Sequence, residues 1–221
     1  MRLWTSVAGK TVEGEYVSIS GDRVILRTPQ RKQIKIPMNE LIPADLEYLD
    51  LSRPPKFKID FRALSNQRQI ASRTGTTAVP TVLQWQFGAK LKQESARRYP
   101  HELEIEYFAI GQQVIDRNKY ILLARGSDTF IPSRENNRSH AFLSEKKVEL
   151  MQFIVDSQAR GRKKSGYLVL VRDKRGSVIQ YATSNEWLWR NLDKLKVLPI
   201  GAFMDNRCNR VYPTGPKSSK Y

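Results

Sequence analysis

Alternation of apolar and polar residues recurs along most of this chain, and it restricts the chain to a fold built from strands. Successive side chains of a strand point to opposite faces, so such alternation is typical of a half-buried strand. The pattern predicts strands at residues 11–19, 23–28, 33–37, 58–64, 80–87, 102–108, 119–124, 148–155, 167–171 and 177–182. Short turns separate many of them, so we expect a mainly β protein with antiparallel sheets.

The first fifty residues form a unit of their own in this pattern. Three short strands follow one another, and Pro43 opens a short helical turn. So few residues bury a small core, and a closed barrel would leave no strand edge unpaired. We therefore expect a small β-barrel over residues 1–51. Residues 52–56 contain Pro54 and Pro55 and predict a stiff linker.

Several short motifs of this unit resemble a known family. They are Trp4-Thr5, Gly9-Lys10, Glu13-Gly14-Glu15, Gly21–Leu26, Ile34–Pro37 and Leu41–Leu49, the last with an Asp-x-x-Tyr sequence. Together they are similar to the Sla-homology domain, a Src-homology-3-like small barrel. That domain is known from a yeast endocytic adaptor, where it binds short Asn-Pro-Phe-x-Asp peptides, and similar modules occur in exported bacterial proteins. The resemblance implies the barrel fold and favours export over a cytoplasmic location. Its matched positions determine the fold, so peptide binding is not transferred.

The larger part, residues 57–213, is expected to form a β-rich sandwich or open barrel with one or two helices. One helix is predicted near residues 184–196, where Thr183 and Glu186 fit a capping box and Leu188, Leu192 and Leu195 share one face. Before it, the turn at residues 173–176 places a glycine where a left-handed conformation is favoured. Residues 214–221 predict a flexible tail.

Composition excludes several classes of protein. No apolar run approaches the roughly 18 residues that a transmembrane helix requires. The single cysteine, Cys208, permits no internal disulfide and no multi-thiolate zinc site, and there are only two histidines. The phosphate-loop motif is incomplete, because Tyr167 stands where lysine is required. The Gly-x-Ser-x-Gly motif of serine hydrolases does not occur. We expect no metal and no cofactor.

Positive charge is concentrated in the larger part of the chain. The chain has 38 lysines and arginines against 22 acids, a formal net charge of +16. Residues 1–55 contribute only +1 of this excess, and the remainder contributes +15. Such an imbalance favours polyanionic partners such as nucleic acid or acidic glycan, although it also fits a surface that is merely well solvated.

Three basic clusters are the candidate binding residues. They are Arg62, Arg68 and Arg73; Lys90, Lys92, Arg97 and Arg98; and Arg160, Arg162, Lys163, Lys164, Arg172, Lys174 and Arg175. Residues 158–166 are the densest of these and are expected to form a glycine-flanked loop. If the clusters share one continuous face, their cations can neutralise several phosphates or sulfates.

A catalytic alternative rests on Asp128. Asp128 and Thr129 at a strand end are similar to the Asp-Thr pair of aspartic proteases, although Phe130 replaces the glycine of that motif. Such chemistry requires a second carboxylate, from Asp173, Asp205 or a symmetry mate. On this hypothesis the chain is an exported hydrolase, or an adhesin, that acts on mucin-like or cell-surface glycoprotein.

The sequence thus favours a non-enzymatic, monomeric protein that binds a polyanion through its larger domain. DNA or another nucleic acid is the first candidate ligand and an acidic glycan is the second. We expect binding that is electrostatic and independent of sequence, because no recognition helix or RNA-binding aromatic motif is present. A third hypothesis, a peptide-binding adaptor, would depend on the small barrel alone.

Overall fold

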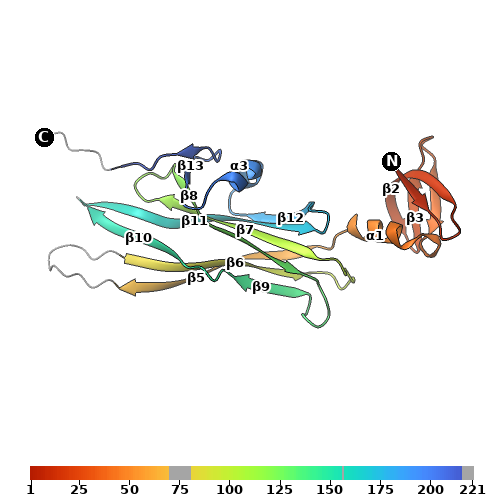
Figure 1. Cartoon of the computed structure of the whole chain (residues 1–221), viewed down its shortest axis with the longest axis horizontal. Coiled ribbons are helices and arrows are strands. Elements are labelled where there is room, and N and C mark those ends of the chain that lie inside the picture. The colour runs from red at the N-terminus through yellow and green to blue at the C-terminus, as the bar shows by residue number, and fades with distance from the viewer. Residues whose placement is uncertain (70–80, 156, 216–221) are drawn as a thin grey trace. The chain divides into compact units, whose positions relative to one another are not determined.

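The computed structural model describes residues 1–69, 81–155 and 157–215 (Figure 1). The chain divides into two compact units, Met1–Pro54 and Pro55–Tyr221. Both consist mainly of antiparallel strands, so the predicted mainly β class is confirmed. None of the helices in the described part is long and apolar enough to cross a membrane.

The N-terminal unit is a four-stranded meander followed by a helix. Its elements are β1 (Arg2–Thr5), β2 (Thr11–Ser20), β3 (Arg23–Arg27), β4 (Gln33–Pro37), η1 (Met38–Glu40) and α1 (Pro43–Leu51). The expected barrel is not closed. Within these fully described residues the sheet has the open order β1-β2-β3-β4, and its ends meet only through an isolated bridge between Ser6 and Leu41. Because η1 follows β4 directly, no fifth strand is left to complete the ladder.

The Asp-x-x-Tyr motif fastens α1 of this unit to β1. Asp45 is only 1% exposed, and its carboxylate accepts hydrogen bonds from Arg2 Nε at 3.1 Å and from the amide of Thr5 at 2.7 Å. The guanidinium of Arg2 also lies 4.4 Å from the centre of the Tyr48 ring, which in turn packs edge-on against buried Trp4. These contacts give the motif a structural role, since the Asp45 carboxylate and the Tyr48 ring both make contacts within the unit.

In its described residues, the C-terminal unit has ten strands and two short helices. They are β5 (Phe57–Gln69), β6 (Thr81–Gln93), β7 (Leu103–Gln113), β8 (Tyr120–Phe130), β9 (Ser139–Leu143), β10 (Val148–Val155), β11 (Gln158–Asp173), β12 (Val178–Thr183), α2 (Glu186–Arg190), α3 (Leu192–Val197), β13 (Phe203–Met204) and β14 (Arg210–Val211). The strand order is β14-β13-β8-β7-β11-β10-β6-β5, with β12 paired to β11 and β9 paired to β6.

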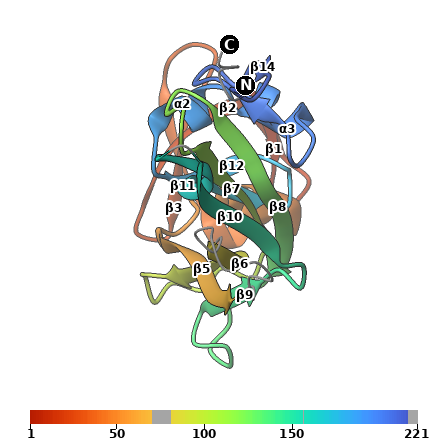
Figure 2. The same ribbon diagram turned by 90° about the vertical axis from the view of Figure 1, so that its left-hand side faces the viewer.

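This sheet folds back on itself into two layers. Strands β5, β6 and β9 form one layer, and β7, β8, β11 and β12 form the other (Figures 1 and 2). Strand β10 joins them, because Val148–Gln152 pairs with β6 whereas Gln152–Val155 pairs with β11. Between the layers, the ring of Phe61 on β5 stacks on Tyr167 of β11 with 4.7 Å between centroids.

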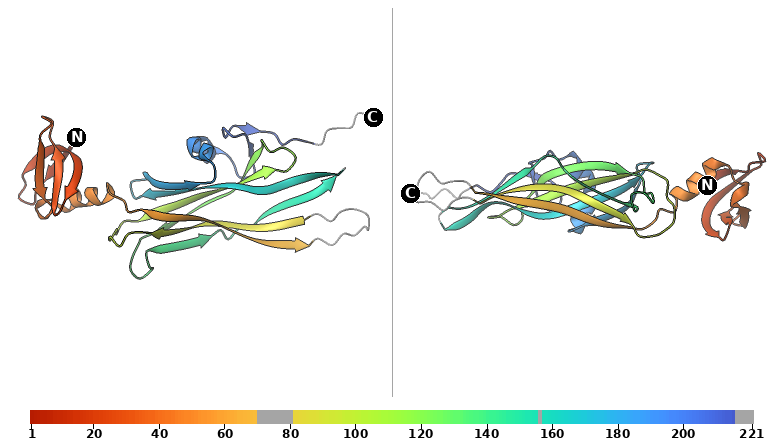
Figure 3. Two further views of the ribbon diagram at one scale, coloured as in Figure 1. Left: turned by 180° about the vertical axis from the view of Figure 1, so that it is seen from behind. Right: turned by 90° about the horizontal axis from the view of Figure 1, so that it is seen from below.

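The outer face of the β7–β11 layer is also covered, which explains why these strands are apolar on both faces. Helices α2 and α3 lie against this side, away from β5 and β6 (Figure 3). Leu188 and Leu195 of the helices join Phe108 of β7 and Leu168 of β11 in one buried cluster. A strand enclosed on both faces needs apolar residues at successive positions, as the sequence of β11 has at residues 168–171.

The predicted helix at residues 184–196 is two helices instead of one. Asn191, with φ −113° and ψ 27°, interrupts the helix between α2 and α3. The expected capping box is absent, since Asn185 is the N-cap and makes no side-chain capping bond. The Thr183 hydroxyl instead lies within hydrogen-bond distance of two carbonyl oxygens, 3.0 Å from that of Tyr167 and 2.9 Å from that of Asn185, so this side chain ties the helix entry to β11.

Of the remaining expectations about loops and the tail, one is wrong, one stays a prediction and one is confirmed. Residues 158–166 belong to β11 and are not a loop, because β10 and β7 pair with them on both sides. Thr214 of the expected tail is held by Gln113, and residues 216–221 lie outside the described part. Gly176 has φ +77° in the predicted turn between β11 and β12.

Candidate functional site

The first half of β11 carries bases at the end of the sheet where β10 and β11 meet. Figure 2 views the C-terminal unit from this end. Gly161 lies between Arg160 and Arg162 with φ +105°, and a β-carbon added there would lie 2.0 Å from the carbonyl oxygen of Met151 on β10. Only glycine permits this close approach. The glycine therefore allows the two arginines to flank a tightly paired hairpin.

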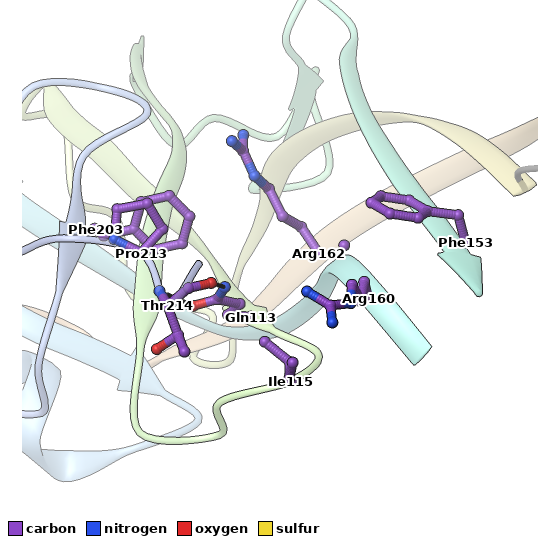
Figure 4. Close-up of a pocket in the computed structure, with 9 residues that line it drawn as sticks. Gln113, Ile115, Phe153, Arg160, Arg162, Phe203, Pro213 and Thr214 are labelled. Carbon is purple, nitrogen blue, oxygen red and sulfur yellow. Dashed lines mark hydrogen bonds between the residues drawn. The ribbon is translucent and has the colours of Figure 1, made fainter. Parts of the chain in front are cut away.

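Both arginines line a cavity of about 410 Å³ (Figure 4). The rings of Phe153 and Phe203 form part of its wall, and the guanidinium carbon of Arg162 lies 5.3 Å from the centre of the Phe203 ring. This is the distance of a cation–π contact, which holds the charge over an aromatic face. In Figure 4 the guanidinium of Arg160 points toward Gln113, whereas that of Arg162 points away from it.

Arg160 has unused hydrogen-bonding capacity in this cavity. Its Nε is buried and has no hydrogen-bond partner among the described residues, and its Nη2 makes only a 3.4 Å contact with Gln158. Buried donors are nearly always paired in folded proteins, so an unpaired one in a cavity indicates a place for an external acceptor. An anion would satisfy both the hydrogen bond and the charge.

The C-terminal segment forms a fixed wall of the cavity. The side chain of Gln113 donates to the carbonyl of Thr214 at 2.7 Å and accepts from its amide at 3.0 Å. The Thr214 hydroxyl donates to Asp116 at 2.7 Å. This bond, with a second from the amide of Asn118, lowers the pKa of the Asp116 carboxyl. The Asp116 carboxylate therefore stays ionised across the neutral pH range and can accept this bond throughout it.

A second cavity, of about 230 Å³, shares one lining residue, Arg162, with the first. Lys146 and Lys147 of the β9–β10 turn line it and are exposed. Two residues beyond Arg162 on β11, Lys164 Nζ lies 5.1 Å from the centre of the Trp85 ring. We call the two cavities with these three lysines and both arginines the Arg162 cleft.

The Arg162 cleft also contains one acid, Glu149, and one predicted base of the same segment, Lys163, does not belong to it. Glu149 lines the second cavity, where its carboxylate accepts a hydrogen bond from Gln84 Nε2 at 2.8 Å. Lys163 pairs with Gln112 and points to the opposite face of β11 from Arg162. Five cations against one acid leave the cleft strongly positive.

Three other predicted bases occupy a different surface. Arg62, Lys90 and Lys92 lie on the outer face of β5 and β6, where the ladder places Lys92 opposite Lys58 and Lys90 opposite Asp60. This face therefore carries four bases and an acid. It lies away from the β7–β11 layer, so it does not continue the Arg162 cleft.

The bases near the β11–β12 turn are neutralised. Arg172 Nη2 lies 3.1 Å from a carboxylate oxygen of Glu106, and its Nε lies 3.9 Å from Glu104. Arg175 pairs with the buried carboxylate of Asp173 at 2.6 Å. That these arginines bind a polyanion stays a prediction, which their ion pairs within the fold do not favour.

The remaining predicted bases are placed as follows. Arg97 and Arg98 lie in the loop between β6 and β7, and Lys174 lies in the β11–β12 turn. Arg68 belongs to β5 but its side chain is outside the described part, as is the whole of Arg73. The predicted bases thus do not form one continuous face. Of the predicted bases whose side chains the structure describes, Arg160, Arg162 and Lys164 are those that belong to the Arg162 cleft.

Asp128 has a different partner from the one that the protease hypothesis requires. Its carboxylate lies 2.8 Å from His140 Nε2 and accepts a bond from the amide of Thr129. Of the proposed second carboxylates, Asp173 is bonded to Arg175 and Asp205 to Asn209. Within the described residues no group of three or more histidine, cysteine or acidic side chains is placed to hold a metal ion.

Cys208 is buried in the core cluster of the β7–β11 layer. Burial, and to a lesser extent the charge of Asp205, raises the pKa of its thiol to about 11. A thiol with so high a pKa carries almost no thiolate at neutral pH and is a poor nucleophile.

This raised pKa predicts a specific pH dependence of stability. Above about pH 9 the unfolded chain ionises Cys208 while the folded chain does not, so its contribution is present below pH 9 and is lost as the pH approaches 11. Relative to Cys208→Ala, the wild-type free energy of unfolding should decrease by about 2 kcal/mol between pH 8 and 10.5. Urea titrations of both proteins measure this difference, in which ionisations common to both cancel. A difference that stays constant with pH would contradict a buried, protonated thiol.

Comparisons with known proteins supply no identity. No family model matches the sequence, and no curated protein matches it. A solved structure from Akkermansia muciniphila is similar over 59% of this chain and 70% of its own chain, at 10% identity and a TM-score of 0.25. So weak a likeness supports no conclusion about fold or function. The resemblance of residues 2–50 to the Sla-homology domain stays a prediction.

Proposed function

We propose that the C-terminal unit binds polyanions without catalysis, and that the Arg162 cleft is its binding site. The observation that supports this most is the placement of four cations along two cavities that share Arg162, with Lys164 two residues further along β11. Nucleic acid is the first candidate ligand, and an acidic glycan is the second.

The directions of the two arginines favour a chain-like ligand over a single ion. Their guanidinium groups point to different parts of the cleft (Figure 4). Each can then contact a separate phosphate or sulfate along a polymer, and the lysines of the second cavity extend the row of charges.

Aromatic side chains accompany these charges. Phe153 and Phe203 line the first cavity, and Phe203 already stacks with the Arg162 guanidinium. In proteins that bind single strands, bases stack on such rings while the cations follow the backbone. These features support nucleic acid over glycan, and contacts of both kinds are tolerant of sequence.

The test removes two charges from the cleft and, in a control, two from elsewhere. At about 0.1 M salt, loss of two phosphate contacts should weaken binding roughly 60-fold, because each contact releases about one counterion. We expect this of Arg160→Ala/Arg162→Ala. The matched control, Arg62→Ala/Lys92→Ala, removes the same net charge from the outer face of β5 and β6 and should have a small effect.

Fluorescence anisotropy with labelled DNA and labelled heparin measures both variants. Equal losses in both would mean that net charge, and not the cleft, determines affinity. Tighter binding of heparin than of DNA at equal charge would favour the glycan. Absence of binding to either polymer would reject the proposal.

A further inference from the structure

A separate cavity of about 430 Å³ carries three arginines. Arg98, Arg134 and Arg138 line it, together with Pro100 and Pro132. This cavity lies beyond the C-terminal end of β8, where Phe130 pairs with Leu103, the first residue of β7. The Arg162 cleft lies at the other end of β7, because Gln113, the last residue of that strand, lines its first cavity. The length of β7 separates the two sites by roughly 30 Å.

The positive charge of this cavity is not compensated by the described residues. No carboxylate lines it, and none of the three arginines has an ion pair with a described residue. Arg98 and Arg134 are exposed and Arg138 is half-buried. Three guanidinium groups around one cavity repel one another, and a bound anion would remove that repulsion.

The β8–β9 turn fixes the position of Arg138. Asn137 and Arg138 both have φ of +52°, a conformation that residues with a side chain rarely adopt. Hydrogen bonds hold this turn, from the Arg138 amide to the Ser133 carbonyl at 2.8 Å and from the Gln93 amide to the Arg138 carbonyl at 2.9 Å. The backbone of this arginine is therefore held by hydrogen bonds through both its amide and its carbonyl group.

We propose that this three-arginine cavity binds a tetrahedral oxyanion, either phosphate or sulfate, carried as an ester on a larger molecule. Guanidinium groups form paired hydrogen bonds with such oxygens. The cavity exceeds the volume of a free ion, and Pro100, Ile131 and Pro132 offer apolar surface to the rest of the ligand. The inference is independent of the proposed function, since the two sites share no residue.

The experiment uses the full chain with Arg160→Ala/Arg162→Ala, so that binding at the cleft does not contribute. Calorimetric titrations with glucose 6-phosphate, glucose 6-sulfate, inorganic phosphate and inorganic sulfate are compared with chloride at equal ionic strength. Adding Arg134→Ala should weaken oxyanion binding at least tenfold. Adding Arg117→Ala, which removes an exposed arginine from the β7–β8 loop, should leave it unchanged.

Some outcomes of these titrations identify the kind of anion that binds, and others overturn the proposal. Tighter binding of the sugar esters than of the inorganic ions supports the ester ligand. Equal binding of both retains the oxyanion site but rejects the larger ligand. No binding beyond that of chloride, or equal binding by the Arg134→Ala and Arg117→Ala variants, overturns the proposal. Arg134 is exposed and makes no described side-chain bond, so its loss should not unfold the chain; Arg134→Lys provides a second variant, with weakened binding again expected.

Discussion

Raising the salt concentration from 50 to 200 mM should weaken binding of double-stranded DNA by about 500-fold. The logarithm of the binding constant falls with the logarithm of salt at a slope of about −0.9 for each phosphate neutralised. If all five cations of the Arg162 cleft contact phosphates, the slope is about −4.5. Anisotropy titrations at four or more salt concentrations measure it. An affinity that is the same at both concentrations would contradict an electrostatic site.

The same titration distinguishes the form of the nucleic acid and the residues responsible. For a single strand the slope per phosphate is about −0.7, so the same increase in salt should weaken the binding affinity roughly 130-fold. In Arg160→Ala/Arg162→Ala the slope for duplex DNA should become about −2.7, whereas in Arg62→Ala/Lys92→Ala it should stay near that of the wild type. A slope unchanged by the first pair would assign the phosphate contacts to other residues.

Strands were predictable from the sequence because their signal is local. Residues 58–64 alternate, and they lie within β5, where Phe57 is buried while Lys58 and Asp60 are exposed. Residues 167–171 are continuously apolar and lie within β11, which packs against β5 on one face and the helices on the other. Burial on one or two faces is thus visible in the pattern itself. Closure of the N-terminal sheet is not, because it depends on how strands far apart in sequence meet.

The errors at residues 158–166 and 184–196 have a common origin. Basic residues flanked by glycines are typical of loops, yet pairing with β7 and β10 makes residues 158–166 a strand. The leucine spacing and capping pattern indicate one helix, yet Thr183 bonds to Tyr167 across the sheet and Asn191 interrupts the helix. In both places tertiary contacts override local preference.

The candidate site was predictable only in part, for the same reason. Arg160, Arg162 and Lys164 are close together in sequence, so their local density was visible. Lys146 and Lys147 were missed, although two adjacent bases before an apolar strand are a signal, because only β10 brings them beside β11.

Sequence also misjudged which bases are available. Arg172 is neutralised by Glu106, a residue 66 positions away that β7 brings next to β11. The alternating acids of β7 therefore determine that Arg172 is part of the fold and not of a binding surface. The sequence shows how many cations a segment contains. The sheet register determines which of them lie next to a carboxylate and which do not.

Gly161→Ala should destabilise the C-terminal unit by about 3–4 kcal/mol and weaken polyanion binding. The left-handed backbone alone costs a residue with a side chain about 1–2 kcal/mol. The added β-carbon would also lie 2.0 Å from the Met151 carbonyl oxygen, so β10 and β11 must separate and lose hydrogen bonds. Arg160 and Arg162 flank this position, and their displacement should lower DNA affinity in proportion to the disturbance of the cleft.

Gly176→Ala is the matched control for this substitution. Gly176 has φ +77°, also in the left-handed region, but a β-carbon there meets nothing within 4 Å. Gly176→Ala should therefore lower the free energy of unfolding by only about 1–2 kcal/mol. It should retain DNA affinity, although Lys174 and Arg175 precede this glycine in the sequence. Urea unfolding and anisotropy on the two variants compare them directly. Equal losses of stability would show that the close approach of β10 to Gly161 contributes nothing. Lowered stability with unchanged DNA affinity in Gly161→Ala would separate the hairpin from the binding site, and would leave the bases elsewhere on the unit to account for any binding.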